Sequence, residues 1–231
     1  GSLTYSSSTL IIYFSLPKKT QTDTILMLLV LIWSLRLGIF LFRRILQDGI
    51  DNRFTKPKQS FFHFLQYWTG QAMWVSFTCI AVYVAMITEE ENKLSIISIV
   101  GLFIWIIGFS IEVTSDTQKR NFRKDSENKG KFISSGLWSR SRHPNYFGEI
   151  TLWVGIAVIS ITSLKGIGYI ALISPLFVYI LLSKGSGIPL LERSADKKWG
   201  NDSDYKDYKK NTPVLFPKLF NNVENTDSYG D

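Results

Sequence analysis

The sequence has little of the residue types on which many soluble sites depend. Its 231 residues include one cysteine and two histidines. A single cysteine excludes a disulfide framework and a Cys-rich metal site, and two histidines leave few ligands for a zinc centre. The sequence also lacks a nucleophile–His–acid order and a nucleic-acid-binding module. We therefore expect no metal and no nucleic-acid partner, and an aromatic content of 14% excludes a disordered chain.

Long apolar runs are what the sequence does have, although its mean hydropathy is only +0.08. Five runs carry at most one charge each, at 25–42, 72–88, 94–111, 150–164 and 167–183. A hydrocarbon core of about 30 Å needs roughly 17–25 apolar residues as helix, and only a helix satisfies its own backbone in lipid. A soluble protein with five buried helices is the less favoured alternative. The sequence thus predicts an all-α, multi-pass membrane protein with about five long transmembrane helices.

Positive charge gathers between these runs. Lys and Arg number 26 against 19 Asp and Glu, and most of them fall in three segments, 43–58, 119–142 and 184–218. Basic loops favour the cytoplasmic side of a membrane, so these segments and the C-terminus are predicted to share that face. A surface that merely faces lipid headgroups would have the same composition, and this alternative stays open. The compartment is open among the endoplasmic reticulum, a mitochondrial membrane and a bacterial inner membrane.

We expect three parts along the chain. Residues 1–23 form an N-terminal segment whose apolar stretch at 8–16 is too short to span and is either a truncated helix or interfacial. Residues 24–217 form one membrane domain. Residues 218–231 form a polar tail.

Charged residues first converge at the end of the third apolar run. Asp116, Arg120 and Arg123 are spaced i, i+4 and i+7, which places them on one face of a helix. Two guanidinium groups on one face suit a phosphate or pyrophosphate. An ordinary basic helix next to the membrane would also have this pattern.

A second group of polar residues leads into the fourth run. Arg142 and His143 can contact anions, Asn145 offers donors and an acceptor, and Tyr146 offers a phenol. Pro144 suits the first turn of a helix, whose N-terminus favours a nearby anion. Glu149 follows at the edge of the hydrocarbon, where an acid is either functional or paired, in this case with Arg120 or Arg123.

The stretch Arg142–Glu149, followed by Trp153 and Gly155, resembles the C-terminal signature of the steroid 5α-reductase-like superfamily, and most closely its DUF1295 branch. Isoprenylcysteine carboxyl methyltransferases share only the Arg-His-Pro-x-Tyr part. The resemblance covers roughly residues 24–217 and also includes the Asp116, Arg120 and Arg123 positions, with further matching segments at 33–38, 51–54, 186–193, 205–208 and 216–217.

This resemblance implies a helical membrane fold whose cytosolic-side loops close over an NADPH pocket in the C-terminal half. It implies that NADPH contacts Asp116, Arg120, Arg123, Asn145 and Glu149, together with Tyr205 and Lys209 or Lys210 near the closing motif. Such a fold does not use a Rossmann crevice, so the lack of a G-x-G-x-x-G turn is no objection.

The implied reaction is hydride transfer from NADPH to an activated C=C bond of a lipophilic, sterol- or enone-like substrate that enters between helices. The first half of the chain has no match to the Glu and Tyr that polarise the substrate carbonyl in steroid reductases. Tyr146 and Gln71 are therefore the candidate catalytic residues, as polarisers or proton donors at that oxygen.

Two other classes of function stay open. One is an isoprenylcysteine-type methyltransferase that uses S-adenosylmethionine. The other is a non-catalytic subunit that binds lipid or assembles with partners in a larger membrane complex. The expected partners are accordingly a lipophilic substrate, membrane lipids and, in the last case, further membrane subunits.

Overall fold

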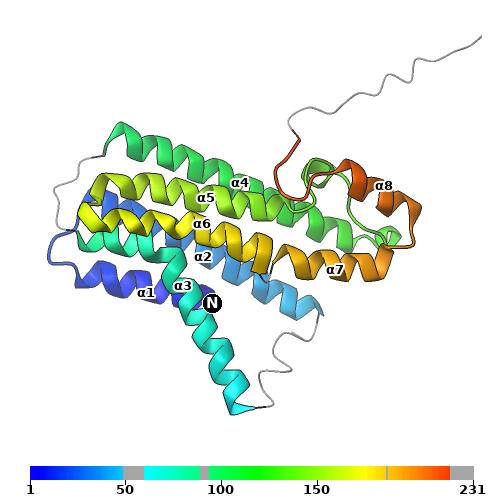
Figure 1. Ribbon diagram of the computed structural model, residues 1–231, viewed down its shortest axis with the longest axis horizontal. Coiled ribbons are helices and arrows are strands. Elements are labelled where there is room, and N and C mark those ends of the chain that lie inside the picture. Colours follow the sequence, from blue (N-terminus) through cyan, green and yellow to red (C-terminus); the bar gives the residue numbers. More distant parts are fainter. Residues whose placement is uncertain (49–59, 89–93, 186, 219–231) are drawn as a thin grey trace, which may run out of the picture. The chain divides into compact units, whose positions relative to one another are not determined.

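The computed structural model describes residues 1–48, 60–88, 94–185 and 187–218, and its regular secondary structure within these ranges is entirely helical (Figure 1). The α-helices are α1 (Ser2–Ser15), α2 (Gln21–Asp48), α3 (Phe61–Ile87), α4 (Ile96–Lys124), α5 (Pro144–Ser160), α6 (Ser174–Ile180), α7 (Ile188–Trp199) and α8 (Ser203–Asn211). Shorter turns are the 3-10 helices η3 (Ser126–Asn128), η4 (Gly136–Ser139), η5 (Ile161–Ser163) and η6 (Gly166–Ile173), and the π-helix η7 (Leu181–Gly185). The all-α prediction is confirmed.

Five helical stretches are long and apolar enough to cross a membrane: Gln21–Arg43, Phe61–Ile87, Ile96–Lys124, Pro144–Ser163 and Gly166–Trp199. Each of them overlaps one of the five predicted runs, so the multi-pass prediction is confirmed. α1 has 14 residues and a length of about 21 Å, which is too short to span. It begins before the apolar stretch at 8–16 and includes a serine-rich turn, in which the Ser8 hydroxyl donates to the Thr4 carbonyl at 2.6 Å.

The fifth stretch departs from a regular α-helix, contrary to what its apolar run suggests. It begins as η6, continues as α6 and ends as η7. Pro175 stands at the start of α6, where it has no N–H for the preceding turn, and Gly166 has a φ of +49°. These two residues thus stand at the two ends of the irregular segment η6.

The described chain forms two compact units. Unit 1 consists of Gly1–Ile106 and Ile150–Leu181, and unit 2 of Ile107–Glu149 and Leu182–Asp231. Some residues named above lie outside the described part: 49–58 of the first basic segment, with the matching segment 51–54 inside it, Ser186, and the tail beyond residue 218.

Unit 1 is held together by small residues and one aromatic cluster. The hydroxyls of Ser6 on α1 and Ser34 on α2 are 2.8 Å apart. Trp33 packs edge-on against both Tyr5 and Trp153, with ring centroids 5.0 and 5.1 Å apart, and both tryptophans are fully buried. This cluster joins α1, α2 and α5 and is the centre of the unit's core.

Glycine allows two helices of unit 1 to touch through their backbones. A Cβ at Gly155 on α5 would lie 2.6 Å from the Trp105 nitrogen and 2.7 Å from the Gly101 oxygen on α4. Real Cβ atoms are not found so close to backbone atoms, so a side chain here would push α4 and α5 apart.

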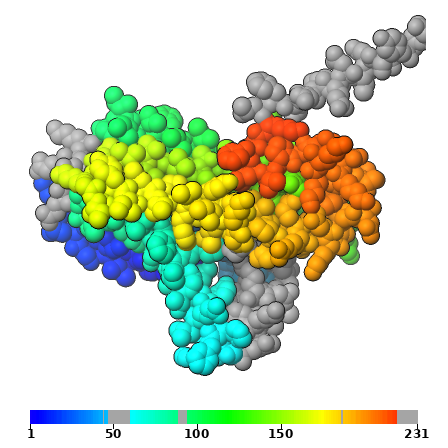
Figure 2. Space-filling model, in the orientation of Figure 1, coloured from blue at the N-terminus to red at the C-terminus, as the bar shows by residue number. Residues whose placement is uncertain are grey.

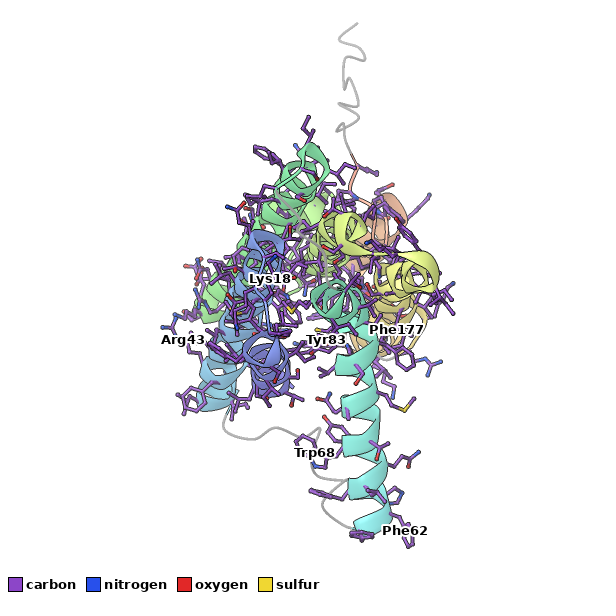
Figure 3. The ribbon with its side chains drawn as sticks, turned by 90° about the vertical axis from the view of Figure 1, so that its left-hand side faces the viewer. Lys18, Arg43, Phe62, Trp68, Tyr83 and Phe177 are labelled. Carbon is purple, nitrogen blue, oxygen red and sulfur yellow. The ribbon has the colours of Figure 1, made fainter. Side chains whose placement is uncertain are left out.

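α3 has two halves with different surroundings. Near its C-terminus, Tyr83 points toward α1, where its hydroxyl lies 2.7 Å from that of Ser8 (Figure 3). Its N-terminal half extends away from the other helices of unit 1, and Phe62 and Trp68 lie on this part (Figure 3). Exposed aromatic side chains of this kind are typical of the level where hydrocarbon meets headgroups.

In unit 2, hydrogen bonds attach the loop after α4 to the C-terminal end of that helix. The Trp138 indole donates to the Ser115 carbonyl of α4 at 3.0 Å, and the Leu137 N–H donates to the Gln118 side chain at 2.9 Å. α7 and α8, which form the orange surface in Figure 2, are joined by an ion pair of 2.5 Å between Asp196 and Lys209. The polar end of α4 thereby serves as the support for the loop that follows it.

Candidate cofactor site

Unit 2 contains a cavity of about 330 Å³. Its wall is formed by α4, by the loop between α4 and α5, and by α7 and α8. The lining residues are Lys119, Phe122, Arg123, Lys131, Phe132, Ile133, Trp138, Arg142, His143, Leu191, Glu192, Ser194, Ala195, Lys198, Trp199, Tyr205 and Tyr208. A volume of this size is at the lower end of the range for ligand pockets.

The charges in this wall are strongly biased. Five of its side chains are cationic, namely Lys119, Arg123, Lys131, Arg142 and Lys198, and one is acidic, Glu192. A concave surface lined by charges of one sign concentrates ligands of the opposite sign. The cavity is therefore suited to an anionic ligand.

Aromatic rings form the rest of the wall. The Phe132 ring lies 5.3 Å from that of Tyr205 and 5.4 Å from that of Tyr208, measured between centroids. The Tyr208 hydroxyl donates to the Trp138 carbonyl at 2.7 Å, and the Lys119 ammonium lies 4.2 Å from the Trp138 ring centroid. Rings and cations that alternate in this way can contact the flat and the charged parts of one ligand.

The tyrosines of the wall remain neutral at physiological pH. Burial raises the pKa of Tyr205 to about 12, and it also raises the pKa of Tyr208 above its ordinary value. Both phenols therefore stay protonated and act as hydrogen-bond donors, Tyr205 to Asp196 at 3.2 Å and Tyr208 to Trp138.

The loop before α5 brings Arg142 and His143 into the wall. The backbone N–H of Arg142 donates to the Pro213 carbonyl at 2.9 Å, and the backbone N–H of Lys218 donates to the Arg140 carbonyl at 3.0 Å. Ser141 is fully buried between these bonds, and its hydroxyl donates to the Leu215 carbonyl at 2.8 Å. The closing segment 213–218 thus fixes the backbone of the loop.

Glu192 on α7 forms hydrogen bonds with the side chains of Arg142 and His143. One of its oxygens accepts from Arg142 Nη1 at 2.5 Å and the other lies 2.8 Å from His143 Nε2. Burial lowers the pKa of His143 below its ordinary value, although the hydrogen bond to Glu192 works against this shift. The imidazole is therefore neutral at physiological pH.

Gly148 sets the position of the first turns of α5 within unit 2. A Cβ at this position would lie 2.6 Å from the Glu112 nitrogen and 2.6 Å from the Gly108 oxygen of α4. Only glycine lets the two backbones approach so closely, which gives a physical reason for the glycine of the Arg142–Glu149 stretch.

The structure brings together some of the predicted cofactor residues and leaves others outside the cavity. Arg123, Arg142, His143 and Tyr205 line it. Lys209 lies beside it, with its ammonium 3.7 Å from Glu192. The lining does not include four residues of unit 2 that were predicted to contact the cofactor: Asp116, Arg120, Asn145 and Glu149. Their role stays a prediction.

The two candidate catalytic residues lie in different units. Tyr146, in unit 2, stacks on His143 with ring centroids 5.8 Å apart and an interplanar angle of 12°. Gln71 belongs to α3 in unit 1, and its side chain lies close to Gly1. A Cβ added at Gly1 would be 3.1 Å from the Gln71 side-chain oxygen. Neither position tests the proposed catalytic role.

Several lining residues were not singled out from the sequence. Glu192 and Tyr208 belong to the matching segments 186–193 and 205–208, but the sequence analysis assigned no role to them. Lys119 has the same i, i+4 spacing to Arg123 as Asp116 has to Arg120, so this spacing could have indicated it. Lys131 and Lys198 are exposed residues far apart in sequence, and no local pattern distinguishes them from other surface lysines. Only the fold brings them to one cavity.

Comparison with known proteins identifies relatives. A family described as "Protein of unknown function (DUF1295)" matches residues 2–212. The chain is 32% identical over 117 residues to 3-oxo-5-alpha-steroid 4-dehydrogenase 1 of Rattus norvegicus, covering 51% of this chain and 40% of that protein. It is 28% identical over 121 residues to steroid 5-alpha-reductase DET2 of Gossypium hirsutum, covering 52% and 42%. The chain thus matches about two fifths of the length of these relatives, and no solved structure matches it.

Proposed function

The chain belongs to the DUF1295 family, a branch of the steroid 5α-reductase-like superfamily, and from this membership we propose that it is a membrane-embedded, NADPH-dependent reductase. It transfers hydride to an activated C=C bond of a lipophilic, steroid-like substrate. The relatives named as steroid reductases support the reaction class. The observation that carries the proposal is the basic, aromatic-lined cavity of unit 2.

The donors in this cavity fit a dinucleotide phosphate. Lys119, Arg123 and Arg142 supply positive charge, and the cavity's cations outnumber its single acid. Arg142 Nε is buried and has no hydrogen-bond partner within the described structure, so its guanidinium is not saturated by protein groups. Guanidinium groups bind phosphate oxygens in pairs, which makes Arg142 and Arg123 the expected phosphate ligands.

The aromatic wall and the exposed lysines have separate roles in this proposal. Trp138 and Tyr208 supply flat apolar surface against which a base or nicotinamide ring can pack. Lys131 and Lys198 are exposed at the cavity and add positive charge for the 2′-phosphate of NADPH. NADPH, when bound, supplies the hydride. The chain's own residues bind and orient it, and Tyr146 and Gln71 remain the proposed donors to the substrate oxygen.

The experiment is a calorimetric titration of the detergent-purified protein with NADPH, NADH and S-adenosylmethionine in parallel. We expect saturable binding of NADPH and none of S-adenosylmethionine. Arg123→Ala should weaken NADPH binding by about 1.5–3 kcal/mol because it removes a charged hydrogen-bond donor. Lys124→Ala, its exposed neighbour outside the cavity, is the matched control and should bind as the parent does.

Each alternative class of function has its own result in this titration. Binding of S-adenosylmethionine alone would replace the reductase by a methyltransferase. Binding of none of the three would favour a non-catalytic subunit, which should then co-purify with other membrane proteins at fixed stoichiometry. If NADPH binds, its oxidation in the presence of a steroid enone tests the reaction itself.

A further inference from the structure

An acidic residue lies in the wall of a cavity whose other charged side chains are all cationic. Glu192 is about four-fifths buried, with 19% of its side chain exposed. A carboxylate in this place repels any anionic ligand, so its presence in an anion site requires a compensating role. Its hydrogen bonds indicate what that role is.

One carboxylate contacts two consecutive residues of the loop before α5. Its Oε2 accepts from Arg142 Nη1 at 2.5 Å, and its Oε1 lies 2.8 Å from His143 Nε2. Glu192 is itself held in place, because Lys209 on α8 approaches it at 3.7 Å and also pairs with Asp196 one turn later on α7. The contacts therefore run from α8 through α7 to the loop.

The same contacts define the state of the His143 ring. A carboxylate only accepts hydrogen bonds, so Nε2 carries the proton that is shared with Oε1. Nδ1 is buried and has no hydrogen-bond partner within the described structure. A second proton there would be a buried, unsatisfied donor, which favours the neutral Nε2–H tautomer.

The charges around the ring act in opposite directions. Glu192 on α7 favours protonation of His143, whereas Lys119 on α4 and Arg142 in the loop disfavour it. Tyr146 on α5 adds no charge and stacks on the ring at 5.8 Å, which fixes its plane. Of these groups, Glu192 is the one that bonds the imidazole directly.

We propose that Glu192 is a positioning residue of the cofactor site, which orients Arg142 toward the nucleotide and holds His143 as its neutral Nε2–H tautomer. The proposal rests on the proposed function, since the ligand for which Arg142 is oriented is NADPH. It explains why an acid is present in a basic cavity: without it, Arg142 loses its side-chain hydrogen-bond partner within the described residues, and the imidazole is free to rotate.

The test uses the fact that the chain has only two histidines. In a His63→Gln background, imidazole 15N NMR of the detergent-purified protein reports His143 alone. We expect the Nε2–H tautomer in the parent, a mixture of tautomers in Glu192→Ala, and a further lowered titration midpoint in Glu192→Gln, which keeps an acceptor but loses the charge. Glu127→Gln, an exposed residue of the same unit, is the matched control and should leave the spectrum unchanged.

NADPH affinity is the second readout. We expect Glu192→Ala to weaken binding roughly ten- to a hundredfold, as for the loss of a charged hydrogen bond, and Glu192→Gln to weaken it less. An unchanged His143 spectrum in Glu192→Ala, or NADPH binding as tight as in the parent, overturns the positioning role. If the parent itself does not bind NADPH, the proposed function fails, whereas the spectrum of the ligand-free protein still decides whether Glu192 orients His143.

Discussion

Units 1 and 2 bury different kinds of polar side chain. In the described part of unit 1 the buried polar residues are serines and threonines, apart from Asp23, which bonds to Thr20 at the start of α2. In unit 2 they include Glu112, Asp116 and His143. Hydroxyls in helices can bond to the carbonyls of the preceding turn, whereas buried charges need partners from other segments. Substitutions in unit 1 should therefore change mainly the stability of the protein. Substitutions in unit 2 should change both its stability and its affinity for the proposed ligand, NADPH.

The largest expected effect concerns the aromatic cluster of unit 1. Trp33→Ala should destabilise the protein by about 3–5 kcal/mol, because it removes a fully buried ring that packs against Tyr5 and Trp153. Thermal unfolding in detergent measures this effect. Trp68→Ala, on the exposed part of α3, is the control and should change the melting temperature little. Equal effects of the two substitutions would show that the cluster is not the core of the unit.

Two glycines sharpen the comparison by testing the same kind of contact in each unit. Gly155→Ala and Gly148→Ala each place a Cβ about 2.6 Å from backbone atoms of α4, and each should cost about 1–3 kcal/mol. We expect Gly148→Ala also to weaken NADPH binding by the folded protein, and Gly155→Ala to leave it unchanged.

Thermal unfolding and calorimetry measure the two effects of these glycine substitutions separately. Gly70→Ala is the control, because nothing lies within 4 Å of a Cβ at that position. Equal loss of NADPH affinity in Gly148→Ala and Gly155→Ala would contradict the separation of stability from binding.

The pH dependence of stability should come from unit 2. The pKa of His143 is lowered by burial, so between this value and the ordinary value of about 6.5 the unfolded chain binds the extra proton. Stability from this group is complete above about pH 6.5 and falls below it, with a slope of at most about 1.4 kcal/mol per pH unit. Melting temperatures between pH 7.5 and 5.5 should show this slope, and His143→Gln should remove it while His63→Gln keeps it. The same slope in both variants would assign it to other groups.

The smallest expected effect is at a helix end of unit 2. Asp202 caps α8, where its carboxylate accepts from the backbone nitrogens of Asp204 at 2.9 Å and Tyr205 at 3.3 Å. Asp202→Ala should cost about 1 kcal/mol in stability, measured as a shift in melting temperature. Asp207→Ala, in the same helix and exposed, should shift it less. The opposite order would mean that the cap does not stabilise the helix.

How far the sequence predicts the structure differs between the two units. The spans, most of which belong to unit 1, follow from apolar runs long enough to cross a bilayer, so their number and approximate bounds were predictable. The breaks in the fifth span were not, because Pro175 and Gly166 are common in membrane helices and do not by themselves fix a 3-10 geometry.

From residue spacing alone, the site was predictable only where residues are close in sequence, whereas Tyr205 was predicted from the family resemblance. Arg142 and His143 are consecutive residues, and Arg123 shares one helix face with Asp116 and Arg120. Local sequence patterns therefore indicate these residues. Glu192 lies 50 residues along the chain from Arg142 and 49 from His143, and no periodic pattern in a sequence indicates a contact over such a separation. Residues that are brought together by loops and by the closing segment can be recognised only from the fold.

The backbone bonds between 140–142 and 213–218 have a consequence for how the protein is made. The acceptor carbonyl of Pro213 lies downstream of all five spans, yet it holds the N–H of Arg142, which precedes the fourth span. During synthesis the spans can enter the membrane before this acceptor has left the ribosome. The cavity of unit 2 is therefore completed only after this acceptor has been synthesised, and a fusion partner inserted between the fifth span and residue 213 would interrupt the cavity without preventing insertion.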